Sequence, residues 1–182
     1  MNFTMRKRVV LAFSLALLLL GPSVAQAGTS GWSTLSTLLA AGLPAAAGLE
    51  SLNQGDTTGL RELIVGEGAT VLSVEALKHV VHERRPDGSG IDSFPSGHTA
   101  AAFAAARYMD KRYGGSQDWL WYSLAGLTGV ARVEARRHHW YDVVAGGTVG
   151  FIAADLSTSS RHSALVITPT AGGLDMQWIR NW

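Results

Sequence analysis

The chain has 182 residues, with 15 Lys and Arg against 14 Asp and Glu, and it contains no cysteine. The balanced charge argues against generic nucleic-acid binding. Without cysteine, disulfides, thiol catalysis and cysteine-ligated metals are excluded. The length is enough for one domain, whose core must be held together by packing alone.

The N-terminal segment has the pattern of a secretory signal. Residues 6–8 are basic, residues 9–20 form an apolar run too short to span a bilayer comfortably, and residues 25–27 read Ala-Gln-Ala, a typical cleavage site. We therefore predict a cleaved signal peptide over residues 1–27 and a single domain over residues 28–182. Export would place the protein in a periplasm or outside the cell, and the alternative is an uncleaved N-terminal anchor.

The first half of this domain predicts two helices. Residues 32–49 are rich in Ala and Leu, and Pro44 is expected to end or kink that helix. Residues 51–59 read as a polar turn. An amphipathic pattern then predicts a helix over residues 60–83, with a break at the glycines of residues 66–68.

The second half predicts three more helices after a Gly, Ser and Asp loop at residues 87–95. These helices are expected over residues 98–112, 119–133 and 141–156. The first is rich in alanine and is followed by two glycines, which commonly end helices. Gly146, Gly147 and Gly150 in the last helix permit another helix to pack closely against it.

The tail differs in kind from the rest. A β-type run at residues 165–169 and an alternating segment beginning at residue 174 flank Ala-Gly-Gly, which predicts a short β-hairpin.

The charge-free runs 119–131 and 143–154 are shorter than the ~20 residues of a membrane span, and residues 29–49 contain Ser, Thr and Pro. We therefore predict an all-α helical bundle with a short C-terminal β-hairpin, either soluble or in peripheral contact with a membrane.

Three short segments carry the residue types of a phosphate pocket, and the first is Lys78, Arg85 and Pro86. The spacing places both cations on one face of a helix, with Arg85 in its last turn before the proline. Two cations that face one point neutralise a phosphate dianion, and the arginine fork binds two of its oxygens. The alternative is a solvated basic end of a helix.

The second segment is Pro95-Ser96-Gly97-His98, directly before the alanine-rich helix. Backbone N–H groups at a helix start lack intrahelical partners and bind anions. Ser96 can cap the helix or donate its hydroxyl to a phosphate oxygen, and His98 can reach a bound phosphoryl group. The alternative is an ordinary capped turn with a surface histidine.

The third segment holds Arg132, His138 and Asp142. His138 and Asp142 are four residues apart and share a helix face. A carboxylate bonded to one imidazole nitrogen would leave the other free to attack phosphorus, although such a pair alone is usually a structural hydrogen bond. Arg132 would add a third cation. The residue four positions after His139 is Val143, which cannot hydrogen-bond to an imidazole. His138 is therefore the better candidate for the nucleophile.

In order and spacing, these motifs within residues 78–142 resemble the type 2 phosphatidic acid phosphatase (PAP2) superfamily. This superfamily also includes class A acid phosphatases and vanadium haloperoxidases. The resemblance implies a PAP2-type helical bundle with His138 as nucleophile, His98 as general acid and Asp142 as its orienting partner. It assigns phosphate binding to Lys78, Arg85, Ser96, Gly97 and Arg132. The family usually has Ser where this chain has Ala131.

The resemblance implies a phosphatase that needs no metal or organic cofactor and forms a phosphohistidine. The substrate would be a lipid phosphate or pyrophosphate, or else a soluble phosphomonoester as in a broad-specificity acid phosphatase. A vanadium haloperoxidase and a non-catalytic phosphate-binding envelope protein are further alternatives, and the oligomeric state is left open. Three arginines close to the motifs fit no motif position and are expected to be solvated or at the substrate rim: Arg84, Arg136 and Arg137. Three histidines are expected at the surface: His79, His82 and His162.

Overall fold

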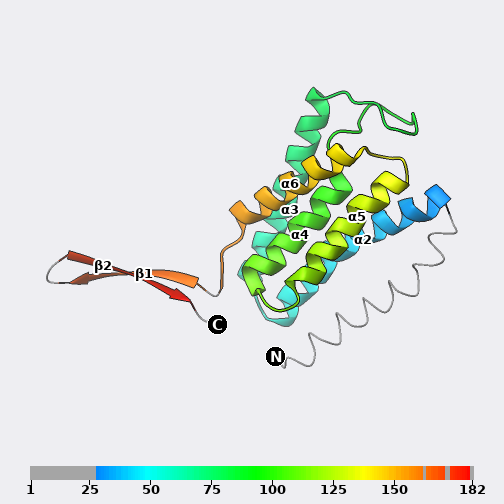
Figure 1. Cartoon of the computed structure of the whole chain (residues 1–182). Helices are drawn as coiled ribbons and strands as arrows, with labels where there is room; N and C mark the ends of the chain where they lie inside the picture. The colour runs from blue at the N-terminus through cyan, green and yellow to red at the C-terminus, as the bar shows by residue number, and fades with distance from the viewer. Residues whose placement is uncertain (1–27, 162, 171–172, 181–182) are drawn as a thin grey trace.

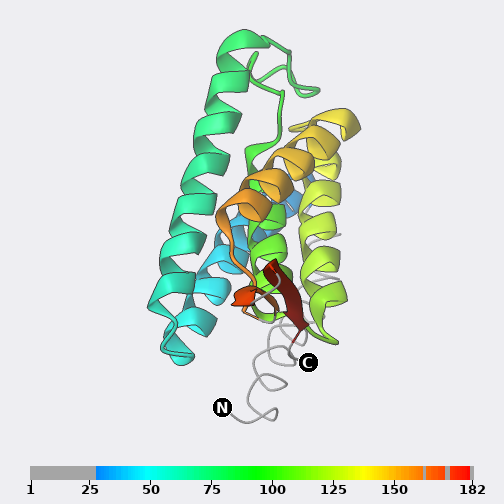
Figure 2. The ribbon, with the colours of Figure 1, turned by 90° about the vertical axis from the view of Figure 1, so that its left-hand side faces the viewer.

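The computed structural model describes residues 28–161, 163–170 and 173–180, so the predicted signal peptide lies outside the described residues. Five helices and two strands make up this part of the chain. They are α2 (Gly28–Asn53), α3 (Thr57–Val80), α4 (Gly97–Tyr113), α5 (Asp118–Glu134), α6 (Trp140–Ser157), β1 (Ser163–Thr170) and β2 (Gly173–Arg180). The helices pack into one bundle (Figures 1 and 2), which confirms the predicted all-α class.

Helix α4 is the centre of the bundle, because it contacts each of the other four helices. Its small side chains allow the other helices to approach it closely. The alanines that lie fully or almost fully buried in α4 are Ala100, Ala102, Ala104, Ala105 and Ala106. One core cluster joins three of these, Ala102, Ala105 and Ala106, to leucines of α2 and α5. A second cluster lies around Tyr108, nearer the C-terminal end of the helix.

The glycines of α6 bring that helix very close to α4, as predicted. A Cβ atom on Gly146 would collide with the carbonyl oxygen of Ser96, and one on Gly150 would collide with the carbonyl oxygen of Ala100. Only residues without a side chain fit at these two points. The start of α4 and the start of α6 are therefore held against each other.

Neither of the two predicted interruptions ends a helix. Helix α2 continues through Pro44, with Leu43 and Ala47 buried on either side of the proline. Helix α3 continues through Gly66, which faces α6: a Cβ there would lie in ordinary van der Waals contact, 3.5 Å from the Cα of Ala154. The predicted polar turn is also shorter than residues 51–59, because both helices extend into it.

The predicted end of the helix that carries the first motif is wrong as well. Helix α3 ends at Val80, and Arg85 lies in the loop that follows. The backbone of this loop makes its own cross-connections: Arg85 N–H donates to Gly90 O at 2.9 Å, and Ser93 N–H donates to Glu83 O at 3.0 Å. These bonds replace the helical ones, so Arg85 reaches its position from a loop and not from a helix face.

The tail forms two antiparallel strands, paired from Ser163 opposite Arg180 to Thr170 opposite Gly173. Among the described residues, neither strand contacts a helix, and the pair extends away from the bundle (Figure 1).

Within the described part, α2 alone is long and apolar enough to cross a membrane by length and composition, which is weak evidence because core helices pass the same test.

The close contact of α4 and α6 predicts a strong effect of one added methyl group. In Gly150→Ala the new Cβ would overlap backbone atoms of Ala100, which move only if the helices separate. We expect the free energy of unfolding to fall by about 1–3 kcal/mol in chemical denaturation. The control is Gly126→Ala in α5, where no neighbouring atom lies within 4 Å of the new Cβ. This control should be neutral or up to about 1 kcal/mol more stable, and equal losses in both variants would contradict the prediction.

Candidate active site

The three motifs meet at one end of the bundle, where α3 and α5 end and α4 and α6 begin (Figure 1). Backbone hydrogen bonds join the segments. Ser96 N–H donates to Asp142 O at 3.0 Å, and Asp87 N–H donates to Arg136 O at 3.0 Å. Residues that are far apart in the sequence are thereby held at one place.

His138 is almost fully buried, at 3% exposure, and its ring is held by the backbone of the loop between α3 and α4. Its Nδ1 lies 2.6 Å from the carbonyl oxygen of Ser93. Because a carbonyl oxygen only accepts, Nδ1 carries the proton and Nε2 keeps its lone pair. This is the tautomer that a histidine nucleophile requires.

Asp142 is fully buried but does not hold His138 by the direct hydrogen bond that the sequence predicted, since its Oδ2 is 3.8 Å from Nδ1. Helix α6 begins at Trp140, so His138 lies outside the helix and the four-residue spacing does not apply. Asp142 Oδ2 instead accepts from Ser93 Oγ at 2.6 Å and from His139 N–H at 2.8 Å. Ser93 therefore links the two residues, with its carbonyl on the ring and its hydroxyl on the carboxylate.

Arg132 is the most deeply placed of the predicted cations, at 4% exposure. Its Nη1 donates to Ser36 Oγ of α2 at 3.3 Å, while its Nε is buried without a hydrogen-bond partner. Burial and the nearby charges of Arg85 and Arg137 lower the pKa of Arg132 to about 10. An anion bound here would relieve both the repulsion and the unmet donor.

Arg85 and Lys78 complete the positive charge. Arg85 Nη2 donates to Asp92 Oδ2 at 2.7 Å, and its Nε is also buried without a partner. Lys78 Nζ lies 3.4 Å from Glu75 Oε1, and its side chain is 20% exposed. Each cation thus has one carboxylate neighbour and donor capacity left for an anion.

The Ser-Gly-His segment begins α4. Ser96 is the N-cap residue, but its side chain makes no capping bond: Oγ lies 2.9 Å from Thr99 Oγ1 and the residue is fully buried. Gly97 is the first residue of the helix. His98 is half-buried, and its Nε2 lies 3.3 Å from Thr37 Oγ1 of α2. The histidine therefore lies between the start of α4 and a hydroxyl of α2.

The same cations act on both histidines. Burial, followed by the charges of Arg132, Lys78 and Arg85, lowers the pKa of His98 to about 4. Burial and the charge of Arg132 lower the pKa of His138 to about 4, although the Ser93 carbonyl opposes this. At neutral pH the site therefore combines fixed positive charge with two neutral imidazoles, an arrangement suited to an anion.

Sequence reasoning missed three hydroxyl residues. Ser93 lies in a loop rich in Gly, Ser and Asp, where no spacing distinguishes it from its neighbours. Ser36 and Thr37 belong to α2, whose Ser and Thr residues the sequence analysis considered only as evidence against a membrane span. Their contacts are made across the bundle, so no local pattern could have revealed them.

Arg137 and the other arginines and histidines named above as fitting no motif are partly or fully exposed wherever the structure describes them. Arg137 Nη1 pairs with Asp87 Oδ2 at 3.0 Å, and its charge contributes to the lowered pKa of His98, which places it at the rim of the site. Four others are exposed, as expected: Arg84, Arg136, His79 and His82. His162 lies outside the described residues.

The sequence indicated no metal-ligand set, because only His138 and Asp142 had suitable spacing. The fold nevertheless brings Glu83, His139 and Asp142 together, each with a ligand atom within 4.8 Å of the others. Glu83 comes from the loop after α3 and the other two from the start of α6. This group lies directly behind the nucleophile.

Comparison with known proteins gives the family. The model of the PAP2 superfamily matches residues 59–165, more than half of the chain, and the chain belongs to this superfamily. It is 40% identical over 86 residues to a lipid A 1-phosphatase of Porphyromonas gingivalis (46% of this chain, 19% of that protein). It is 33% identical over 128 residues to a lipid A 4'-phosphatase of Helicobacter pylori (64% of this chain, 65% of that protein).

The chain thus spans less than two thirds of the length of either relative. The crystal structure of Aquifex aeolicus LpxE superposes with a TM-score of 0.61 at 22% identity, over 71% of this chain and 84% of that one. This likeness shows a shared fold. The resemblance first seen in the three motifs is confirmed at the level of the family.

The charge of the site predicts a ligand-dependent titration of His98. Its pKa of about 4 results from burial and positive neighbours, so a bound phosphate dianion should raise it by neutralising those neighbours. In 15N NMR we expect the ring to remain neutral from pH 7 down to about 5 without ligand. With saturating inorganic phosphate, protonation should begin at a higher pH. His98→Gln assigns the signal, and identical titrations with and without phosphate would contradict the prediction.

Proposed function

We propose that this protein is an exported, metal-independent phosphatase that hydrolyses a phosphomonoester or pyrophosphate of a membrane lipid through a phosphohistidine on His138. One observation carries the proposal. The bond from His138 Nδ1 to the Ser93 carbonyl leaves Nε2 unprotonated in a site whose positive charge comes largely from Arg132 and Arg85. A nucleophile without a proton beside fixed cations is what attack on a phosphate dianion requires.

In the first step, Nε2 of His138 attacks phosphorus, and the bond from phosphorus to the leaving oxygen breaks as the P–N bond forms. Protonated His98 gives its proton to the leaving oxygen. The three motif cations bind the oxygens over which negative charge is spread. The Ser93 carbonyl and the charge of Asp142 at 3.8 Å stabilise the positive charge that develops on His138.

In the second step, water attacks the phosphohistidine. Neutral His98 takes a proton from that water, its oxygen bonds to phosphorus, and the P–N bond breaks to release inorganic phosphate. His98 is then protonated for the next cycle, while His138 regains its lone pair. The bound dianion makes the protonated state of His98 accessible, because it neutralises the charges that lower its pKa to about 4 in the free protein.

A lipid substrate is supported by two observations. Both curated relatives described above are named as phosphatases of lipid A, a phosphorylated lipid. At the same end of the bundle as the motifs, large apolar side chains are exposed: Val80 at 77%, Ile91 at 57% and Trp140 at 68%. These residues border the site on α3, the following loop and α6, where they could meet the acyl part of a substrate at a membrane surface. The signal-like pattern of residues 1–27 supports export.

The test is phosphate release by the purified full chain in detergent, from para-nitrophenyl phosphate and from a panel of lipid phosphates, with EDTA present. We expect lipid phosphate to be preferred and EDTA to leave turnover intact. His138→Ala should lower kcat by about 10³-fold or more, since it removes the nucleophile. The control is His79→Ala, an exposed histidine outside the motifs, which should stay within about twofold.

Turnover indifferent to His138→Ala would overturn the phosphohistidine step. A preference for the soluble ester would indicate a broad-specificity phosphatase. Halide oxidation with vanadate and peroxide would indicate a haloperoxidase, and phosphate binding without release would indicate a binding protein.

A further inference from the structure

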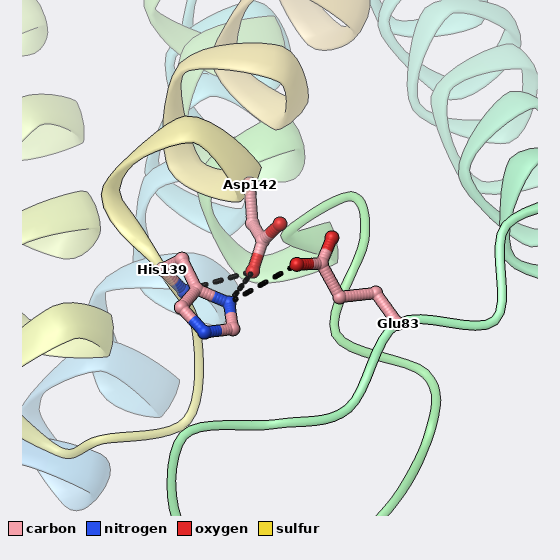
Figure 3. A group of neighbouring side chains, drawn as sticks. All are labelled: Glu83, His139 and Asp142. Carbon is pink, nitrogen blue, oxygen red and sulfur yellow. Dashed lines mark hydrogen bonds and ion pairs between the residues drawn. The ribbon is translucent and has the colours of Figure 1, made fainter.

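We propose that Glu83, His139 and Asp142 form an inhibitory binding site for a divalent metal ion of the zinc type, directly behind His138. Figure 3 shows the three side chains turned toward one another, with the imidazole of His139 beside the two carboxylates. The group draws on two segments, the loop after α3 and the start of α6. The inhibitory part of this inference rests on the proposed phosphatase function, whereas metal binding does not.

The two distances from His139 fit a small tetrahedral ion, and the two carboxylates lie within 4.8 Å of each other. His139 Nδ1 lies 3.3 Å from Asp142 Oδ2 and 3.6 Å from Glu83 Oε1. Zinc bonds to imidazole nitrogen and carboxylate oxygen are about 2.0–2.2 Å long, so two ligands of a tetrahedral zinc ion are about 3.3–3.6 Å apart. One nitrogen and two carboxylate oxygens would leave a fourth position for water. The imidazole favours zinc, copper or nickel over magnesium and calcium.

The ligands are held in place by neighbouring groups. Tyr141 OH donates to Glu83 Oε1, and its ring stacks on His139 with 5.0 Å between ring centroids. Ser93 Oγ and the His139 N–H both donate to Asp142 Oδ2. Such outer contacts orient metal ligands and limit their movement. The side chains of His139 and Glu83 are 33% and 25% exposed, so an ion can reach them from solvent.

A separate observation points to a missing ligand. Asp142 is fully buried, yet its Oδ1 has no hydrogen-bond partner. A buried carboxylate oxygen without a partner is costly. Two carboxylates beside a single imidazole also carry more negative charge than that ring can offset. A divalent cation would balance this charge, and an ion held by both oxygens of Asp142 would also give Oδ1 a partner.

Metal binding here would oppose catalysis without occupying the phosphate position. The negative charge of Asp142 lies 3.8 Å from His138 Nδ1 and favours the positive charge that forms on that ring. An ion bound to Asp142 would cancel this effect and add positive charge behind the nucleophile. We therefore expect kcat to fall with little change in KM.

The binding test uses the full chain after chelator treatment, with Zn²⁺ in calorimetry and Co²⁺ as a visible-absorption probe of tetrahedral ligation. We expect one ion per chain, with Kd raised about tenfold or more by Glu83→Gln and by His139→Gln. The control is His82→Gln, an exposed histidine next to Glu83 in sequence, which should bind as the wild type does. Absence of binding, or binding lost with His82→Gln instead, would overturn the site.

The activity test compares each variant in Zn²⁺ with the same variant in EDTA. Zn²⁺ should lower kcat of the wild-type protein about tenfold or more at saturation, and the loss should be much smaller in Glu83→Gln. Metal binding without any fall in kcat would overturn the inhibitory role. If no variant shows turnover, the proposed phosphatase function fails while the calorimetry still decides the metal site.

Discussion

The contact between α4 and α6 is the constraint on which the candidate site depends. Gly146 lies against the backbone of Ser96, and the Ser96 N–H donates to the carbonyl oxygen of Asp142. One contact therefore fixes the second motif relative to the third. Because backbone atoms and not flexible side chains meet here, the relative position of His98 and His138 is set to within the tolerance of close packing.

Buried positive charge is the second organising feature. Charge is costly in a region shielded from water, and the two imidazoles respond by remaining neutral. The arginines cannot respond in this way, and two of them keep an Nε without a partner. The resulting site favours a doubly charged anion, because such a ligand satisfies these donors and relieves their mutual repulsion.

Ser93 changes how the histidine and aspartate cooperate. With its carbonyl on His138 and its hydroxyl on Asp142, it separates two tasks that a direct bond would combine. The carbonyl fixes the tautomer, and the carboxylate contributes its charge from 3.8 Å. The same carboxylate has Oδ1 without a partner and Oδ2 at 3.3 Å from His139 Nδ1. The support of the nucleophile and the inferred metal site therefore share Asp142.

The sequence by itself determined the helical class, the three motifs and the family, because helix periodicity and motif spacing are local properties. It also marked Gly146 and Gly150 as points of close packing. It misplaced Arg85 on a helix, and it inferred a direct bond from Asp142 to His138 from a helix turn that does not exist there. Only the tertiary structure decided that Ser93 lies between those residues and that Glu83 meets His139. These contacts join segments far apart in the chain, and packing between helices sets them.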